Sequence, residues 1–153
     1  YGRITYQLME YWRTVLENPS DEKSMNDFAI AIDKIPKIVF SHTLKNVEWE
    51  SAKLVNRDIE EEVLELKQSR SQSPVDNGGS KVILVGSRSL IIQLMKLNLI
   101  DEYQLCVHPV IAGSGLPLFK NISEKIRLKL IKTKTFSGGA VILYYEPTSE
   151  KTT

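Results

Sequence analysis

The stretch that most restricts the fold of this chain is "KVILVGSRSLIIQLM", residues 81–95. Residues 82–85 are all apolar, which favours a strand covered on both faces, as in a parallel sheet. From Leu90 onward the apolar residues recur at helical spacing and lie on one side of a helix. A buried strand that passes through a short turn into a helix is typical of α/β proteins, so this stretch predicts that class.

The rest of the chain predicts further elements of the same two kinds. Helical spacing begins near the start of the chain, recurs over residues 25–35 and follows Asp58, which precedes an apolar face as an N-cap residue does. Asn98 can supply the left-handed residue that ends the helix after residue 90. Residues 68–80 are polar and predict a surface loop. Strands are predicted over residues 37–43, 51–56 and 103–113, and an antiparallel hairpin over 126–136 and 140–147.

These elements predict one domain over residues 1–147, followed by a tail at 148–153. The predicted architecture is a three-layer α/β/α domain with a mixed, mostly parallel sheet and a C-terminal antiparallel hairpin. The length of 153 residues suits a single domain with a sizeable core.

Composition excludes several classes of function. Twenty Lys and Arg against 19 Asp and Glu leave no basic excess for nucleic acid or for a membrane surface. The longest apolar stretch is interrupted by polar residues and is too short to span a bilayer. Cys106 is the only cysteine and there are only two histidines, so we expect a reducing, cytoplasmic location and no metal site.

The turn "GSRS", residues 86–89, has the composition of an anion-binding site. Backbone N–H groups and the helix dipole favour an anion where a buried strand leads into a helix. Gly86 lets a ligand approach the backbone, Ser87 and Ser89 add hydroxyl groups, and Arg88 adds a positive charge. A phosphate suits these groups, although a simple N-cap explains the turn equally well when it is taken alone.

Two other segments carry residues of the same kind. The GRIT segment, residues 2–5, begins a helix, and the SHT tip, residues 41–43, ends a strand. Three anion-binding turns on one open sheet favour an extended ligand with several phosphates lying across the strand ends. A dinucleotide fits that description.

Taken together, "GRITY", "KIVFSHT", the block from "KVILV" to "GLPLF" and "AVILYYEP" resemble the dihydrofolate reductase-like superfamily. The closest branch includes the C-terminal domain of the bifunctional deaminase/reductase of riboflavin biosynthesis. The resemblance implies NADPH as the cofactor, with its pyrophosphate at the GSRS turn, further phosphate contacts at the GRIT segment, and its adenosine 2′-phosphate near the SHT tip. The implied cofactor-binding residues are Gly2, Arg3, Thr5, Ser41, His42, Thr43, Gly86, Ser87, Arg88, Ser89 and Leu90.

The resemblance also implies an N-terminal segment before Tyr1, with the first strand and a loop beside the nicotinamide, so that strand is expected to be missing here. No catalytic residue is therefore assigned. Dedicated riboflavin reductases carry an acidic residue where this chain has Val85, and an aspartate with basic residues after G-R-x-T where it has "YQLMEYW". Val85 cannot hydrogen-bond a uracil amine, which favours a paralogous reductase.

The resemblance therefore leads us to expect an NADPH-dependent reductase that transfers hydride to a small heterocycle, pterin-like or aminopyrimidine-like. Such an enzyme is related to 5-amino-6-(5-phosphoribosylamino)uracil reductase and acts as a homodimer on a small-molecule substrate. The alternative is a protein that binds NADPH or another nucleotide on the same fold without catalysis, as a sensor or assembly protein.

Overall fold

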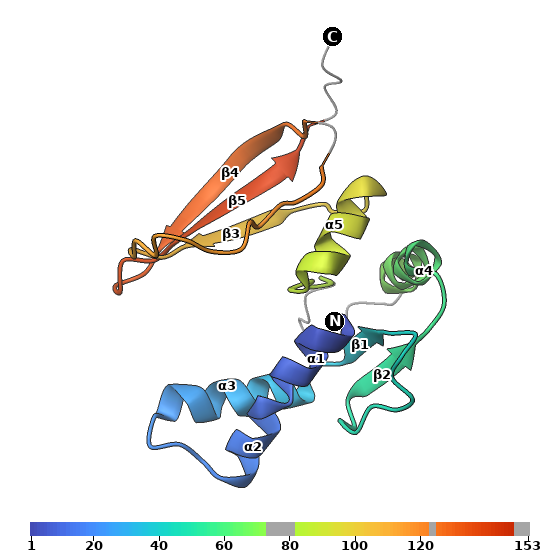
Figure 1. Cartoon of the computed structure of the whole chain (residues 1–153), viewed down its shortest axis with the longest axis vertical. Helices are drawn as coiled ribbons and strands as arrows, with labels where there is room; N and C mark the ends of the chain where they lie inside the picture. The colour runs from blue at the N-terminus through green and yellow to red at the C-terminus, as the bar shows by residue number, and fades with distance from the viewer. Residues whose placement is uncertain (73–81, 123–124, 149–153) are drawn as a thin grey trace. The chain divides into compact units, whose positions relative to one another are not determined.

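The structure is a computed structural model that describes residues 1–72, 82–122 and 125–148. The chain divides into two compact units, residues 1–90 and 91–153. Helices occur together with a parallel strand pair and an antiparallel sheet (Figure 1). The predicted α/β class, with both kinds of strand pairing, is therefore confirmed. The extent of the domain, residues 1–147, stays a prediction.

The first unit holds the helices and strands that the first half of the sequence predicts. The N-terminal helix is divided at Glu10, where a turn separates α1 from α2. The helix predicted after Asp58 continues to residue 72, so the prediction of a polar loop at 68–80 is wrong over its first five residues. The rest of that predicted loop lies outside the described residues. The elements are α1 (Arg3–Met9), α2 (Tyr11–Glu17), α3 (Lys23–Lys34), β1 (Lys37–Phe40), β2 (Ala52–Val55) and α4 (Ile59–Gln72), and α5 (Arg88–Lys96) begins in this unit.

Strands β1 and β2 pair in parallel, with Phe40 opposite Val55 at their carboxyl ends. The N–H of Ser41, the next residue after β1, donates to the carbonyl oxygen of Val55 over 3.1 Å. On the other side of β1, Gly2 forms an isolated parallel bridge with Phe40. The SHT tip, the end of β2 and the start of α1 therefore meet at one edge.

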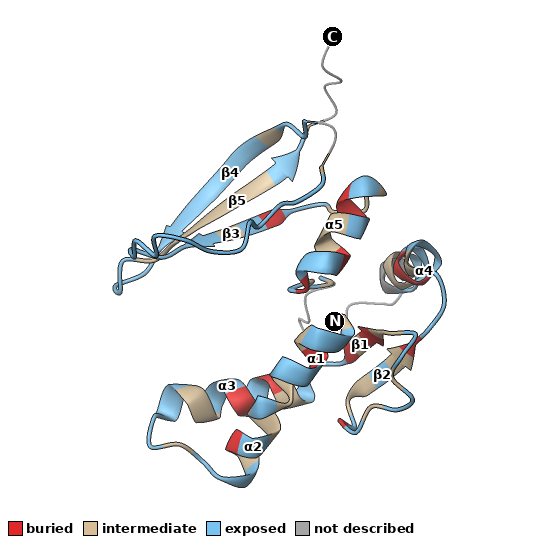
Figure 2. Cartoon of the chain, viewed as in Figure 1, coloured by how far each residue is buried: buried red, intermediate tan, exposed pale blue. Residues whose placement is uncertain are grey.

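The core of the first unit is a cluster of Tyr6, Ile32, Val39 and Trp49. Figure 2 shows buried positions on α1, α3 and β1, the elements that supply the first three of these residues. The hydroxyl oxygen of Tyr6 accepts hydrogen bonds from the backbone N–H groups of Glu48 and Trp49, at 3.2 and 3.3 Å. A buried Tyr needs such a partner for its polar end, so this residue anchors the segment before β2 to α1.

Lys37, the first residue of β1, is buried with only 3% of its surface exposed. Its Nζ donates to the carbonyl oxygens of Ile32, Asp33 and Ile35, at 2.5, 3.2 and 2.8 Å, and to Ser51 Oγ at 2.7 Å. The last carbonyls of a helix have no partner within the helix, and here a lysine supplies one. Lys37 therefore fixes the end of α3 to the start of β1.

The second unit contains an antiparallel sheet in the order β3-β5-β4. The predicted hairpin is confirmed, since β4 and β5 pair in antiparallel fashion around a turn in which Gly139 has φ of 83°. The strand predicted at 103–113 is shorter than expected and ends at Val107. The strands are β3 (Tyr103–Val107), β4 (Leu128–Thr135) and β5 (Val141–Pro147).

The end of α5 follows the prediction made for Asn98, whose φ of 54° is left-handed. The N–H of Leu99 donates to the carbonyl oxygen of Leu94 over 2.9 Å, and that of Asn98 to Met95 over 3.1 Å. This pair of bonds is the Schellman arrangement, which satisfies two of the carbonyl groups left free at a helix end.

The parallel strand predicted over residues 82–85 is wrong. Residues 82–87 are described and form no strand, and Val82 and Leu84 are 62% and 80% exposed. The parallel and antiparallel strands consequently form two separate sheets among the described residues, with one parallel pair instead of a mostly parallel sheet. An apolar run predicts burial but does not specify a hydrogen-bonded neighbour, and a strand requires both.

Candidate functional site

The GRIT segment and the GSRS turn are joined by direct hydrogen bonds. The backbone N–H of Gly2 donates to Ser87 Oγ over 3.3 Å, and Thr5 Oγ1 donates to the same oxygen over 3.0 Å. Ser87 is only 3% exposed, so its hydroxyl serves first to hold the two segments together. Two of the three predicted anion-binding turns are therefore neighbours in the structure.

The SHT tip lies next to them, because Gly2 pairs with the last residue of β1 and the tip begins one residue later. Ser41 Oγ accepts hydrogen bonds from the backbone N–H groups of Thr43 and Leu44, at 3.2 and 3.0 Å. These bonds close the turn and occupy the Ser41 oxygen. His42 and Thr43 are exposed and present the polar groups of the tip.

The packing between the segments requires glycine at one position and leaves space at another. A Cβ on Gly2 would lie 3.0 Å from Ser87 Oγ, 3.6 Å from Ser89 Oγ and 3.9 Å from Leu90 Cγ. A Cβ on Gly86 would meet nothing within 4 Å, and Gly86 is exposed. The inner side is thus closely packed, whereas the backbone at Gly86 is open to a ligand.

The predicted residues that remain are placed as follows. Arg3 is exposed, and its Nη1 donates to Gln7 Oε1 over 3.4 Å. Arg88 and Ser89 are exposed in the first turn of α5, while Leu90 is buried at 7% exposure. Their assignment to a cofactor stays a prediction.

This arrangement fits a diphosphate group chemically. The first turn of α5 contains no acidic residue. Together with the two residues before it, this turn combines a helix N-terminus, the exposed backbone of Gly86, hydroxyl groups and the side chain of Arg88. Backbone N–H groups at a helix start and arginine are preferred partners of phosphate oxygens. The absence of a carboxylate in that turn avoids like-charge repulsion.

A cluster at the end of β2 was missed from the sequence. Arg57 Nε pairs with Glu62 Oε2, and Arg57 Nη2 lies 2.5 Å from Glu65 Oε2. The Glu62 carboxylate is 4% exposed and also lies 4.0 Å from Lys53 Nζ. The hydrogen bond and charge of Arg57 lower the pKa of Glu65 below its usual value.

One signal in the sequence could have revealed this cluster. Asp58 caps α4, because its Oδ1 accepts from the backbone N–H groups of Glu60 and Glu61, at 2.8 and 3.3 Å. With the cap fixed there, Glu62 and Glu65 are three residues apart and lie on one side of the helix. Arg57 precedes the cap and can reach both of them.

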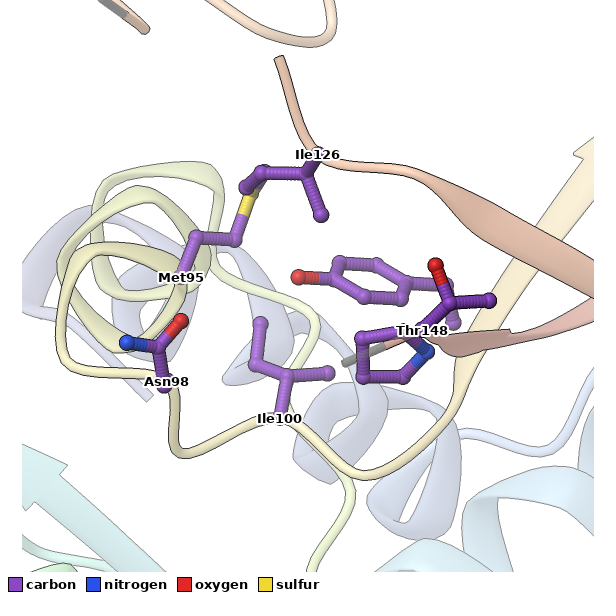
Figure 3. A pocket seen from close by; sticks show the side chains of 7 residues that line it. Met95, Asn98, Ile100, Ile126 and Thr148 are labelled. Atoms are coloured by element: carbon purple, nitrogen blue, oxygen red, sulfur yellow. The ribbon is translucent and has the colours of Figure 1, made fainter. Parts of the chain in front are cut away.

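The second unit contains a cavity of about 290 Å³ near the end of α5. In Figure 3, Met95, Ile100 and Ile126 extend toward this cavity. No charged side chain lines it, so it does not suit a phosphate group. The lining residues are Met95, Asn98, Ile100, Tyr103, Ile126, Pro147 and Thr148.

Two searches of the described residues gave negative results. Within residues 1–72, 82–122 and 125–148, no group of three His, Cys, Asp or Glu side chains could hold a metal ion. Over the same ranges, no helix has both the length and the apolar character needed to cross a bilayer.

The fold and the site together define an α/β protein with adjoining phosphate-compatible turns. A profile of the RibD C-terminal domain family matches residues 4–142, and the chain belongs to that family. The resemblance inferred from the motifs is thereby confirmed, and membership points to a reductase-type function.

The chain is also similar to individual proteins. The chain is 35% identical over 145 residues to YyaP of Bacillus subtilis strain 168, an uncharacterized protein, covering 95% of this chain and 71% of YyaP. It is 42% identical over 67 residues to YwjB, an uncharacterized protein of the same organism, covering 44% of this chain and 38% of YwjB. A crystal structure from Shewanella sp. PV-4, of a protein named for a presumed role in riboflavin biosynthesis, aligns with a TM-score of 0.66 at 19% identity. That alignment covers 96% of this chain and 71% of the Shewanella protein, and it supports the shared fold.

Proposed function

We propose that this protein is an NADPH-dependent reductase that transfers hydride to a small heterocyclic substrate of the pterin or aminopyrimidine class. The observation that carries the proposal is the pair of hydrogen bonds from Gly2 and Thr5 to Ser87, which places two phosphate-compatible segments side by side. Membership of the RibD C-terminal domain family supports the reductase class.

Each segment has a distinct role in this proposal. The open backbone at Gly86, with Arg88 and Ser89, holds the pyrophosphate, and the exposed guanidinium of Arg3 adds a second positive charge. The SHT tip contacts the adenosine 2′-phosphate. NADPH supplies the hydride when it is bound, and the chain binds the cofactor and orients it.

The substrate class is constrained by Val85, which lies directly before the GSRS turn and is partly buried. An apolar side chain offers no hydrogen bond to an amino group of the substrate. We therefore propose a reaction related to that of 5-amino-6-(5-phosphoribosylamino)uracil reductase, on a different substrate, and assign no catalytic residue.

Val85 also favours a second candidate function. A chain that keeps the cofactor segments and lacks a polar group beside the substrate could bind NADPH as a sensor or assembly protein without catalysis. The two functions share the cofactor site and differ in turnover.

Binding and turnover measurements test both candidates. NADPH fluorescence is titrated with the protein, and loss of the reduced nicotinamide absorbance is then followed with a panel of pterins and aminopyrimidines. Binding with turnover supports the reductase, and binding without turnover over the whole panel supports the sensor. Absence of NADPH binding at concentrations well above the dissociation constants typical of related reductases contradicts both candidate functions.

The proposal includes a homodimer formed through the edges of the β3-β5-β4 sheet, whose outer strands are β3 and β4. Unpaired strand edges carry free backbone N–H and C=O groups that a second copy can pair with. Light scattering coupled to size-exclusion chromatography should give twice the mass of the chain, and a monomer at all concentrations contradicts it.

A further inference from the structure

The parallel pairing of β1 and β2 brings Arg57 to the same edge as the SHT tip. The N–H of Ser41 is hydrogen-bonded to the carbonyl oxygen of Val55, so the chain beyond β1 and the chain beyond β2 leave the sheet side by side. His42 follows the first of these residues by one position and Arg57 follows the second by two. Arg57 thus lies at the edge to which the 2′-phosphate of NADPH is assigned.

The guanidinium of Arg57 is held by two carboxylates of very different exposure. Its Nε pairs with Glu62, whose side chain is 4% exposed, and its Nη2 lies 2.5 Å from Glu65, whose side chain is 66% exposed. Nη1 has no hydrogen-bond partner within the described part of the chain, and the Arg57 side chain is 40% exposed. One edge of the guanidinium is therefore anchored by carboxylates, while Nη1 on the other edge has no partner among the described residues.

We propose that Arg57 determines the preference of the site for NADPH over NADH, and that Glu65 competes with the 2′-phosphate for the same guanidinium. This inference rests on the proposed function, because it concerns the adenosine end of the same cofactor site. Arg57 would hold the 2′-phosphate through Nη1 and Nη2 in place of Glu65, while Glu62 would keep its bond to Nε.

The chemistry of the three anions supports this exchange. Arginine presents two parallel N–H groups that match a phosphate in bidentate fashion, and a phosphate carries more charge than a carboxylate. An exposed ion pair such as Arg57 with Glu65 is screened by solvent and is readily exchanged. The buried Glu62 has no such access to water, so it keeps Arg57 oriented.

The surrounding charge explains why Arg57 is needed at this edge. The first turn of α4 carries Glu60, Glu61 and Glu62, and Asp58 caps it. These carboxylates repel a phosphate. The nearby cation Lys53 lies 4.0 Å from Glu62, so its charge is directed at the same carboxylate that Arg57 binds. A cation at this edge offsets that repulsion, and Arg57 has one nitrogen, Nη1, that bonds to neither of the two α4 carboxylates it contacts.

The test compares the dissociation constants of NADPH and NADH, measured by fluorescence at one ionic strength, for the full chain and three variants. Arg57→Lys keeps a positive charge beside Glu62 and removes the two-nitrogen fork. Glu65→Gln removes the competing charge from an exposed position. Glu60→Gln is the matched control, since it removes one exposed negative charge from the same helix.

Arg57→Lys should weaken NADPH binding by about tenfold and change NADH binding by less than about twofold. Glu65→Gln should strengthen NADPH binding by about two- to threefold without affecting NADH. Glu60→Gln removes a charge that does not contact Arg57, so it should change the NADPH/NADH ratio by clearly less than Glu65→Gln does. If Arg57→Lys and Glu65→Gln change the dissociation constants of NADPH and NADH equally, or change neither, Arg57 does not determine the cofactor preference. The proposed cofactor site would not be contradicted by that result. If wild-type protein binds neither cofactor, the proposed function fails as well.

Discussion

The ammonium group of Lys37 lies 3.9 Å from the centre of the Trp49 ring, and each residue is only 3% exposed. Trp49 Nε1 in turn donates to Asp33 Oδ1 over 2.6 Å, at the end of α3. Burial lowers the pKa of Lys37, and the negative charge of Asp33 opposes that effect. The cation is compensated by carbonyl oxygens, an aromatic face and a carboxylate within one small region.

Replacing this lysine should destabilise the first unit. Lys37→Met leaves the carbonyl oxygens at the end of α3 without their donor, at a cost of about 2 kcal/mol in the free energy of unfolding. Lys34→Met, on the exposed side of the same helix end, should change it by less than about 0.5 kcal/mol. Urea denaturation measures both, and equal values for the two variants would show that the Lys37 contacts contribute little.

The two glycines of the site should respond differently to alanine. Gly2→Ala places a Cβ 3.0 Å from Ser87 Oγ and should lower the stability by about 1 kcal/mol. Gly86→Ala meets no neighbouring atom, so the stability should hold while NADPH affinity falls. Thermal melts with and without NADPH separate the effects, and unchanged affinity in Gly86→Ala argues against ligand contact at that backbone.

Arg88 and His42 should differ in cofactor selectivity. Arg88→Ala should weaken NADPH and NADH alike, because both carry the pyrophosphate, by about tenfold. His42→Ala should weaken mainly NADPH, because the SHT tip is assigned to the 2′-phosphate. Fluorescence titrations with both cofactors give the ratios, and equal losses for His42→Ala contradict the assignment of that tip.

Asn98 should tolerate glycine and resist alanine. Its φ of 54° strains any residue with a Cβ, and Asn accepts this conformation better than most. Asn98→Ala should lower the free energy of unfolding by about 1 kcal/mol, whereas Asn98→Gly should leave it unchanged or raise it slightly. A lower stability of the glycine variant than of the alanine variant would contradict the left-handed helix end.

The Arg57 and Glu65 pair should lose its effect in acid. Because the pKa of Glu65 is lowered in the folded protein, its contribution is present above the usual value of 4.5 and disappears as the pH falls through the lowered folded value. The stability difference between wild type and Glu65→Gln should therefore shrink from neutral pH into the acid range. Denaturation curves over that range check this, with Glu60→Gln as the reference variant, and a difference that grows in acid reverses the sign.

Local rules predicted much of this fold from the sequence. The helix cap at Asp58 and the left-handed Asn98 depend on interactions within a few residues, so residue type was sufficient to find them. The hairpin at the C-terminal end was equally clear, since its alternation and its glycine turn are both local.

Features that depend on distant partners were harder to predict. Residues 82–85 were apolar enough for a buried strand, but they belong to none of the strands in the described part of the chain. The burial of Ser87 and the pairing of Arg57 with α4 likewise depend on segments that meet only in the folded chain. For the candidate site, the sequence identified which segments are polar, and the structure added which of them are in contact.

The bond between Thr5 and Ser87 joins residues 82 positions apart, so forming it carries the entropy cost of closing a long loop. The bond is lost whenever the two segments separate in a local opening of the unit. A molecule that bridges these two segments would hold the loop closed and make opening of the unit less frequent. Limited proteolysis in the presence of NADPH would then report on occupancy through the lifetime of the folded state, with no need for a substrate.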